Sequence, residues 1–380
     1  MSVVQVASQV ARLEDIVKIG KDMAYVGTIL GLDTIVESSF AVGFAVGSGW
    51  IGFVAFVISM IGKIDKHEVK YGFKIGLEGA GYEYGVDPLI GAGGDLPTIR
   101  VYDNLGRLLG KSHHRHAKCH DGSDNCVQSV YGIEKQPSYA LLVGKSNAVC
   151  VAAVSVQYPG GDKYGWVGNW ANTCGQPWYY SDVDAQGKNG SLKLNCAWIG
   201  RDGYKRGYST GIRIHFPEFT DGFRGNGNND SYYCRENNTA LSFYQHKNPK
   251  FFDGASKTSH RHQDKKLRPP NKRDEIESTR RFTREVSSNM WKRSVQSHAK
   301  HHSAKALCES ATSAGPSLVS MVEKHFCHMP DKVLYRFCEI VETGPCWDHE
   351  AHAFGAKGAS ALHVRAAMPN IQFDKPMIWG

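Results

Sequence analysis

The residues best suited to metal chemistry form a short histidine-rich segment, KSHHRHAKCHDGSD, at positions 111–124. It brings His113, His114, His116, Cys119 and His120 close together. Imidazole and thiolate are ligands that zinc and copper prefer. The spacing matches no motif of defined geometry, and a disulfide at Cys119 would remove the thiolate. We therefore expect no cofactor and a polar loop here, with a zinc or copper ion on the four histidines as the alternative.

The sequence offers no pattern for nucleophilic or phosphate chemistry. A G-x-S-x-G elbow is missing, and the glycine-rich GAGG at 91–94 lacks the lysine of a phosphate-binding loop. We assign no catalytic residue and expect a protein without enzymatic activity, although a secreted enzyme remains an alternative.

Aromatic residues gather around Cys174 in the segment YGWVGNWANTCGQPWYYS. In a β domain such rings fill the core or form a stacking platform for sugars or lipid headgroups. Core packing is favoured by the neighbouring cysteines. The candidates for ligand binding are Trp166, Trp170, Trp178 and Tyr179.

The 10 cysteines indicate a disulfide framework in an oxidising compartment, because their number is even and no CxxC pair occurs. Sequons at Asn189, Asn229 and Asn237 fit a secreted glycoprotein. The pairing of the cysteines stays open. They are Cys119, Cys126, Cys150, Cys174, Cys196, Cys234, Cys308, Cys327, Cys338 and Cys346.

The expected fold class is α+β and multidomain, with an all-β, sandwich-like, disulfide-bonded central domain at residues 97–250. Short runs of strand type alternate there with turn signals. The runs are 98–102, 139–144, 148–158, 163–170, 192–200 and 211–216.

An uncharged apolar segment, residues 38–62, follows an amphipathic helical pattern in residues 1–37. We assign residues 1–62 to a helical, membrane-competent region, since about 20 apolar residues can cross a bilayer core. Gly47-Ser48-Gly49 is also typical of the tip of a hairpin between two apolar arms, and a buried helical hairpin in the core of a soluble domain is the third alternative. The candidate membrane-contacting residues are Gly43, Gly47, Trp50, Phe53 and Phe56.

The rest of the chain divides by composition. Residues 63–96 are rich in glycine and tyrosine and indicate a linker or an irregular entry into the β domain. Residues 251–305 carry much of the positive charge and read as an exposed basic linker, while the net charge of the whole chain is +8. Because the charge is local, we expect no specific nucleic-acid partner. Residues 306–380 predict a small α-helical module with four cysteines.

Dibasic pairs in the basic linker are candidate sites for a processing protease. We single out Lys272-Arg273 and Lys292-Arg293. The alternative is a solvated basic tail in which the pairs are accidental. The first 20 residues lack the apolar core of a secretory signal, so the route of export stays open.

The aromatic segment above and the tail FCHMPDKVLYRFC…CWD resemble a group of cysteine-containing secreted proteins of filamentous fungi. The similarity covers about residues 100–200 and 305–350 and implies no catalytic residues. The order of the segments also resembles that of fungal killer-toxin precursors, in which an apolar segment and a cysteine-rich body precede dibasic sites and a second cysteine module.

The leading hypothesis is a secreted or membrane-associated, non-enzymatic protein of toxin or effector type. Residues 38–62 would act on a membrane, and the β domain would recognise a cell-surface component. The alternatives are a secreted enzyme or a ligand- or metal-binding protein in which 38–62 is core, and an oligomeric structural protein of a virus or other particle.

Overall fold

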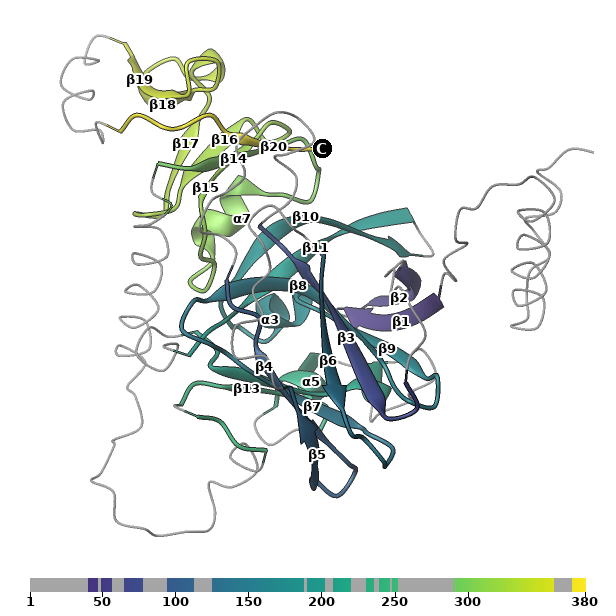
Figure 1. Ribbon diagram of the computed structural model, residues 1–380. Coiled ribbons are helices and arrows are strands. Elements are labelled where there is room, and N and C mark those ends of the chain that lie inside the picture. The colour runs from purple at the N-terminus through teal and green to yellow at the C-terminus, as the bar shows by residue number, and fades with distance from the viewer. Residues whose placement is uncertain are drawn as a thin grey trace, which may run out of the picture.

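The computed structural model describes the chain in segments, and the account below is confined to them (Figure 1). They are residues 40–46, 49–56, 65–77, 94–112, 125–187, 190–201, 208–219, 230–235, 239–246, 248–251, 290, 292–358 and 371–380. The proposed helix in residues 1–37 lies outside them, as do Gly47, the four candidate metal histidines, Cys119, the three sequon asparagines, Lys272 and Arg273.

The larger sheet of the central part has eight strands. Its order is β1-β2-β10-β11-β8-β3-β6, and β9 pairs with β8 beside β11. Its paired strands run antiparallel, and short connections join β1 to β2, β8 to β9 and β10 to β11. The strands are β1 Phe40–Val46, β2 Gly49–Phe56, β3 Glu68–Ile75, β6 Asn125–Tyr131, β8 Val149–Gln157, β9 Lys163–Val167, β10 Trp178–Gly187 and β11 Gly190–Ile199.

A second sheet of five strands lies against the first, with the order β13-β12-β7-β4-β5. Alternate residues of its strands, such as Ile99, Leu142 and Ile214, share one buried cluster with residues such as Tyr71 and Val154 of the larger sheet. This arrangement confirms the sandwich-like central domain. The strands are β4 Thr98–Tyr102, β5 Leu108–Lys111, β7 Tyr139–Val143, β12 Gly211–His215 and β13 Leu241–Tyr244.

Short helices complete the central part. They are α3 Asn169–Thr173, the 3-10 turn η2 Phe216–Phe219 and α5 Asp230–Cys234. The disulfide Cys174–Cys234 joins the ends of α3 and α5, and Cys150–Cys196 joins β8 to β11.

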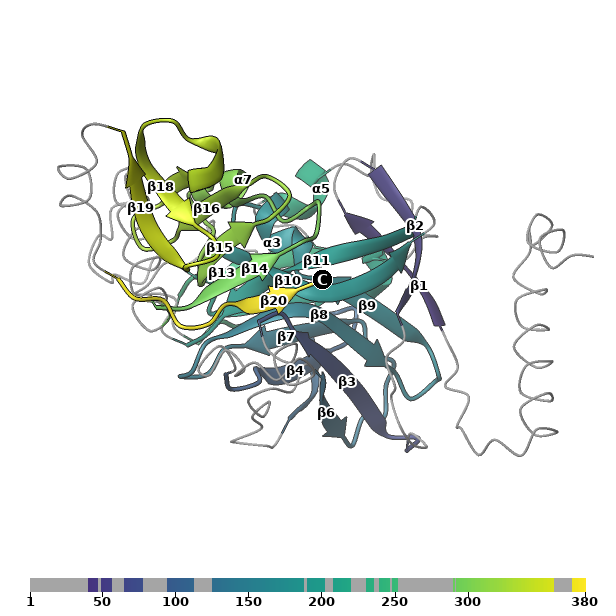
Figure 2. The ribbon, with the colours of Figure 1, turned by 90° about the horizontal axis from the view of Figure 1, so that it is seen from above.

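The C-terminal module, residues 292–380, is mostly β in its described residues, so the expectation of an α-helical module is wrong. Its five-stranded sheet has the order β17-β16-β15-β14-β20, in which β14 is parallel to both β15 and β20. The elements are β14 Ser294–Ser297, α7 Ala304–Glu309, β15 Ser317–Ser320, β16 His325–His328, β17 Val333–Arg336, η3 Cys338–Ile340, β18 Gly344–Asp348, β19 Ala353–Lys357 and β20 Met377–Trp379. Both views place this module beside the β10 end of the larger sheet (Figures 1 and 2).

Three of the expected segment assignments differ from the structure. Residues 63–96 are not simply a linker, because they contain β3, an inner strand with Val69, Tyr71 and Phe73 buried. Alternation explains this strand, since its lysines and glycine occupy the opposite face. The basic segment 251–305 overlaps β14 and the start of α7. Residues 40–46 and 49–56 are strands, so they contradict a helix and match the hairpin alternative.

Disulfides are confirmed for every cysteine in the described part of the chain. Cys308–Cys327 and Cys338–Cys346 stabilise the C-terminal module, and Cys126 is also disulfide-bonded. Such a framework indicates an extracellular or otherwise oxidising location. Across the described residues, no helix has the length and apolar character that crossing a membrane requires.

Candidate functional site

The apolar segment folds as an antiparallel hairpin. Val46 lies opposite Gly49 at its tip and Phe40 opposite Phe56 at its base. Trp50 faces Ala45 across the pair, and Gly43 lies at an irregularity in the register between Val42 and Phe44. Gly43 therefore belongs to a strand and not to a membrane-competent helix.

The hairpin is attached to the sandwich at the edge of the larger sheet. β2 pairs with β10 through Ala55 and Gln186, which makes β1 the terminal strand in the sheet order. β1 also approaches β9 and η2. No charged residue occurs from Phe40 to Phe56. An edge strand usually carries charges that keep other chains or surfaces away, and this one carries none.

The four candidate ligand-binding aromatics are buried. Trp166, Trp170, Trp178 and Tyr179 are at most 2% exposed, so they offer no open ring face to a ligand. Trp170 packs on Phe219 and Tyr233 inside the sandwich. The alternative of core packing is the one the structure shows, and the platform interpretation of these residues is wrong.

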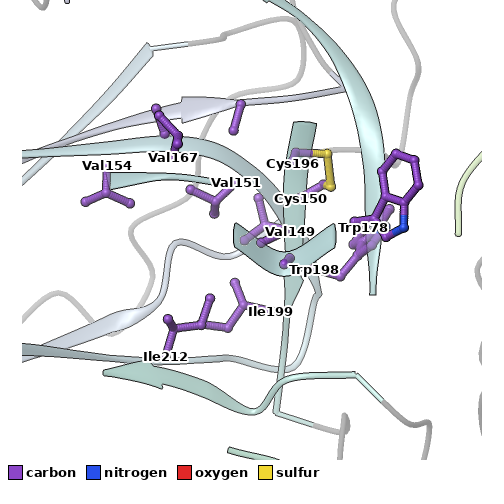
Figure 3. Close-up of a cluster of buried hydrophobic side chains, with 14 of the residues drawn as sticks. Val149, Cys150, Val151, Val154, Val167, Trp178, Cys196, Trp198, Ile199 and Ile212 are labelled. Atoms are coloured by element: carbon purple, nitrogen blue, oxygen red, sulfur yellow. A yellow bond between two sulfur atoms is a disulfide. The ribbon is translucent and has the colours of Figure 1, made fainter. Parts of the chain in front are cut away.

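Trp178 and Tyr179 belong to a group that we call the aromatic ledge: Trp178, Tyr179, Tyr180 and Trp198, on β10 and β11. Figure 3 shows Trp178 and Trp198 close to the Cys150–Cys196 disulfide, at the end of the cluster farthest from Val154. The C-terminal module covers this ledge. The Trp198 indole donates to the carbonyl of Ala314 at 2.7 Å, and the Tyr179 hydroxyl donates to that of Pro316 at 2.8 Å.

Lys332 forms hydrogen bonds with the part of the module that precedes Ala314 and contacts the ledge. The ammonium of Lys332 donates to the carbonyls of Leu307 at 3.2 Å and Ser313 at 2.8 Å, and to the Ser313 hydroxyl. Burial lowers the pKa of Lys332 to about 7. The three acceptors suit the three donors of an ammonium group.

A second polar cluster lies where β12 runs into η2. The Nδ1 atom of His215 is 2.6 Å from Oε1 of Glu218, and the Tyr232 hydroxyl donates to Oε2 of the same carboxylate at 2.5 Å. The ring of Tyr139 stacks on His215 at a centroid distance of 4.1 Å. Glu218 is nearly inaccessible to solvent, whereas the His215 side chain is 17% exposed.

The geometry fixes the role of one imidazole nitrogen. An ionised carboxylate only accepts hydrogen bonds, so Nδ1 of His215 donates to Glu218. Burial raises the pKa of Tyr139 and Tyr232, and the negative Glu218 raises both further. A histidine oriented by a carboxylate in this way can accept a proton or bind a metal through Nε2.

No motif in the sequence predicts this cluster. Its only local signal is the spacing His-x-x-Glu in HFPE, which is uninformative in a chain with 17 histidines. Tyr139 and Tyr232 come from other segments: strand pairing joins Tyr139 to His215, and Tyr232 reaches the site from α5. The described residues contain no group of three or more potential metal ligands.

The processing candidate Lys292-Arg293 lies within the described residues. The carbonyl of Lys292 accepts from the amide of Asp374, and that of Arg293 accepts from the amide of Ser317. The guanidinium of Arg293 lies 4.0 Å from the Asp374 carboxylate. This backbone belongs to the C-terminal module, so its place in an exposed linker is wrong.

No protein-family model matches the chain, and no curated protein matches it.

Proposed function

We propose that this protein acts at lipid membranes from an extracellular position, with the β1–β2 hairpin as the contacting element and without enzymatic activity, in the manner of a toxin or effector. The observation that carries the proposal is an uncharged hairpin of 17 residues attached to the edge of a disulfide-bonded sandwich. Transfer of apolar surface from water into lipid is favourable, by about 25 cal/mol for each Å² buried.

The hairpin suits shallow insertion. Strands of 7 and 8 residues extend about 25 Å at roughly 3.3 Å per residue. Trp50 and the neighbouring phenylalanines are the side chains that favour the interface between lipid headgroups and acyl chains. The basic residues of 251–305 would add attraction to anionic lipid, at about 1 kcal/mol for each residue close to the surface.

Liposome co-sedimentation tests the proposal with paired variants. The double variant Trp50→Ser, Phe53→Ser should bind anionic liposomes at least tenfold more weakly than the unmodified protein. A matched control is Leu105→Ser, Leu108→Ser, which removes two exposed apolar side chains at the β4–β5 turn and should bind normally. Equal binding by the hairpin variant and the unmodified protein would reject the hairpin as the membrane contact.

The His215 cluster supports a second candidate, a secreted enzyme or ligand-binding protein. It requires Nε2 of His215 to be open to small molecules. Diethyl pyrocarbonate, which acylates an unprotonated imidazole nitrogen, should modify His215 faster than His302 and His328, which are 1% and 3% exposed. Peptide mapping by mass spectrometry measures the three rates. A rate for His215 as slow as for the two buried histidines would remove this candidate.

A further inference from the structure

The contact between the aromatic ledge and the C-terminal module has the form of peptide recognition. Residues 312–316, Thr-Ser-Ala-Gly-Pro, lie along the first residue of β10. The amide of Trp178 donates to the carbonyl of Thr312 at 3.3 Å, and the amide of Ala314 donates back to Trp178 at 2.9 Å. Addition of an extended segment to an exposed strand is a general mode of peptide binding.

Side chains of the ledge donate hydrogen bonds to backbone carbonyls of the same segment. In addition to the bonds to the carbonyls of Ala314 and Pro316 already described, the indole of Trp178 donates to the side-chain hydroxyl of Ser310, two residues before the segment, at 3.1 Å. Gly315 lies flat on the ring of Tyr179, and a Cβ atom added to it would come within 2.5 Å of that ring. The ledge therefore selects small residues at this point in the segment.

Apolar packing supports the polar contacts. One continuous buried cluster includes Trp178 and Trp198 of the sandwich together with Leu307, Leu318 and Trp379 of the module. Tyr180 stacks near His302 and exchanges hydrogen bonds with Ser303. Buried aromatic anchors with satisfied polar groups are the features that dominate the affinity of protein interfaces.

The described disulfides do not cross this contact. Cys150–Cys196 and Cys174–Cys234 lie within the sandwich, and Cys308–Cys327 and Cys338–Cys346 lie within the module. Residues 252–289 supply the chain connection between the two parts.

We propose that the C-terminal module is a non-covalent partner of the sandwich, and that the aromatic ledge holds it by recognising residues 312–316 as an added extended segment of small residues. The two parts stay bound at micromolar concentration when the connection through 252–289 is cut. This inference is independent of whether the hairpin binds membranes.

The test uses the full chain with a recognition site for a sequence-specific protease placed between residues 252 and 289. After cutting, two bands on a non-reducing denaturing gel and one peak in native size exclusion at 10 µM are expected. Two native peaks, each with a folded circular-dichroism spectrum, would overturn the proposal. A single band on the denaturing gel from fully cut protein would show that a covalent bond joins the two parts, and this would also overturn the proposal.

Two variants test the recognition segment. Tyr179→Phe keeps the ring and removes one hydrogen bond. The dissociation constant of the two cut parts should therefore rise about tenfold. Gly315→Val should separate them at 10 µM, and Gly160→Ala is the control, since an added Cβ there meets nothing closer than 3.8 Å. Unchanged dissociation of Tyr179→Phe would show that the ledge does not read residues 312–316.

Discussion

Three largely buried charged side chains, Glu218, Arg213 and Lys332, each form hydrogen bonds with more than one polar partner. Glu218 accepts from His215 and Tyr232, and Arg213 donates to the Phe251 carbonyl and the Ser242 hydroxyl. Lys332 has three acceptors. Because an unpaired buried charge is costly, these contacts decide where the chain can place such residues.

Lys332 gives the clearest pH dependence. Its pKa is about 7 in the folded protein against a usual value of 10.5, so the unfolded chain binds more protons between those two pH values. The free energy of unfolding should therefore rise with pH in that interval, by up to about 1.4 kcal/mol per pH unit from this residue.

Urea denaturation at pH 7 and pH 9 measures the effect. The gain in stability on going to pH 9 should shrink in Lys332→Met and persist in Lys305→Met, since Lys305 is exposed. If the Lys332→Met protein shows the same gain as the unmodified protein, the lysine keeps its usual pKa after folding.

Single residues of the site were harder to predict than residues of the core. Trp166 and Trp170 lie beside a cysteine in an apolar run, and that local pattern correctly favoured burial. His215 and Glu218 carry no comparable pattern, because their partners Tyr139 and Tyr232 approach from β7 and α5 and the sandwich must form before the cluster exists.

At the scale of elements, short runs of strand type between turn signals predicted strands of the sandwich well. The runs at 98–102, 139–144 and 211–216 coincide with β4, β7 and β12 to within a residue. The strands of the C-terminal module were missed for a local reason. The turns before β16 and β17 end at Lys324 and Lys332, whose φ angles are 54° and 58°. Glycine or asparagine normally marks such turns, so the sequence lacked the usual signal.

Gly76, directly after β3, makes a strong prediction about one element contact. An added Cβ would lie 2.4 Å from Cβ of Cys196, beside the Cys150–Cys196 disulfide. Gly76→Ala should lower the free energy of unfolding by about 1–3 kcal/mol, because neither β3 nor the disulfide can move away freely.

Chemical denaturation measures this loss, with Gly160→Ala as the control, and thiol titration shows whether the disulfide still forms. A Gly76→Ala protein as stable as the control would mean that the strand end relaxes without cost.

At the scale of the whole molecule, the sandwich and the C-terminal module share one buried cluster although residues 252–289 separate them in the chain. Composition suggested a basic linker up to residue 305. The structure begins the module near Lys292, because Ser294–Ser297 pairs on both sides with parallel strands. Parallel pairing joins segments far apart in sequence, and local patterns carry no information about it.

This boundary predicts how the pair Lys292-Arg293 responds to proteases. A protease needs an extended, unpaired backbone, whereas the carbonyls of both residues accept hydrogen bonds in the folded module. A dibasic-specific protease should therefore leave the peptide bond after Arg293 intact in native protein and cut it after denaturation. Mass spectrometry of the fragments decides this, and rapid native cleavage after Arg293 would contradict the boundary.

The pairing of β14 with β20 also has a consequence for synthesis on the ribosome. Val295 pairs with Met377, which is translated 82 residues later, and Trp379 contributes to the buried cluster. The sandwich can fold while translation continues, but the sheet of the module stays incomplete until residues 377–379 leave the exit tunnel. A ribosome that stops before residue 377 would therefore produce a nascent chain whose aromatic ledge has no finished module to cover it.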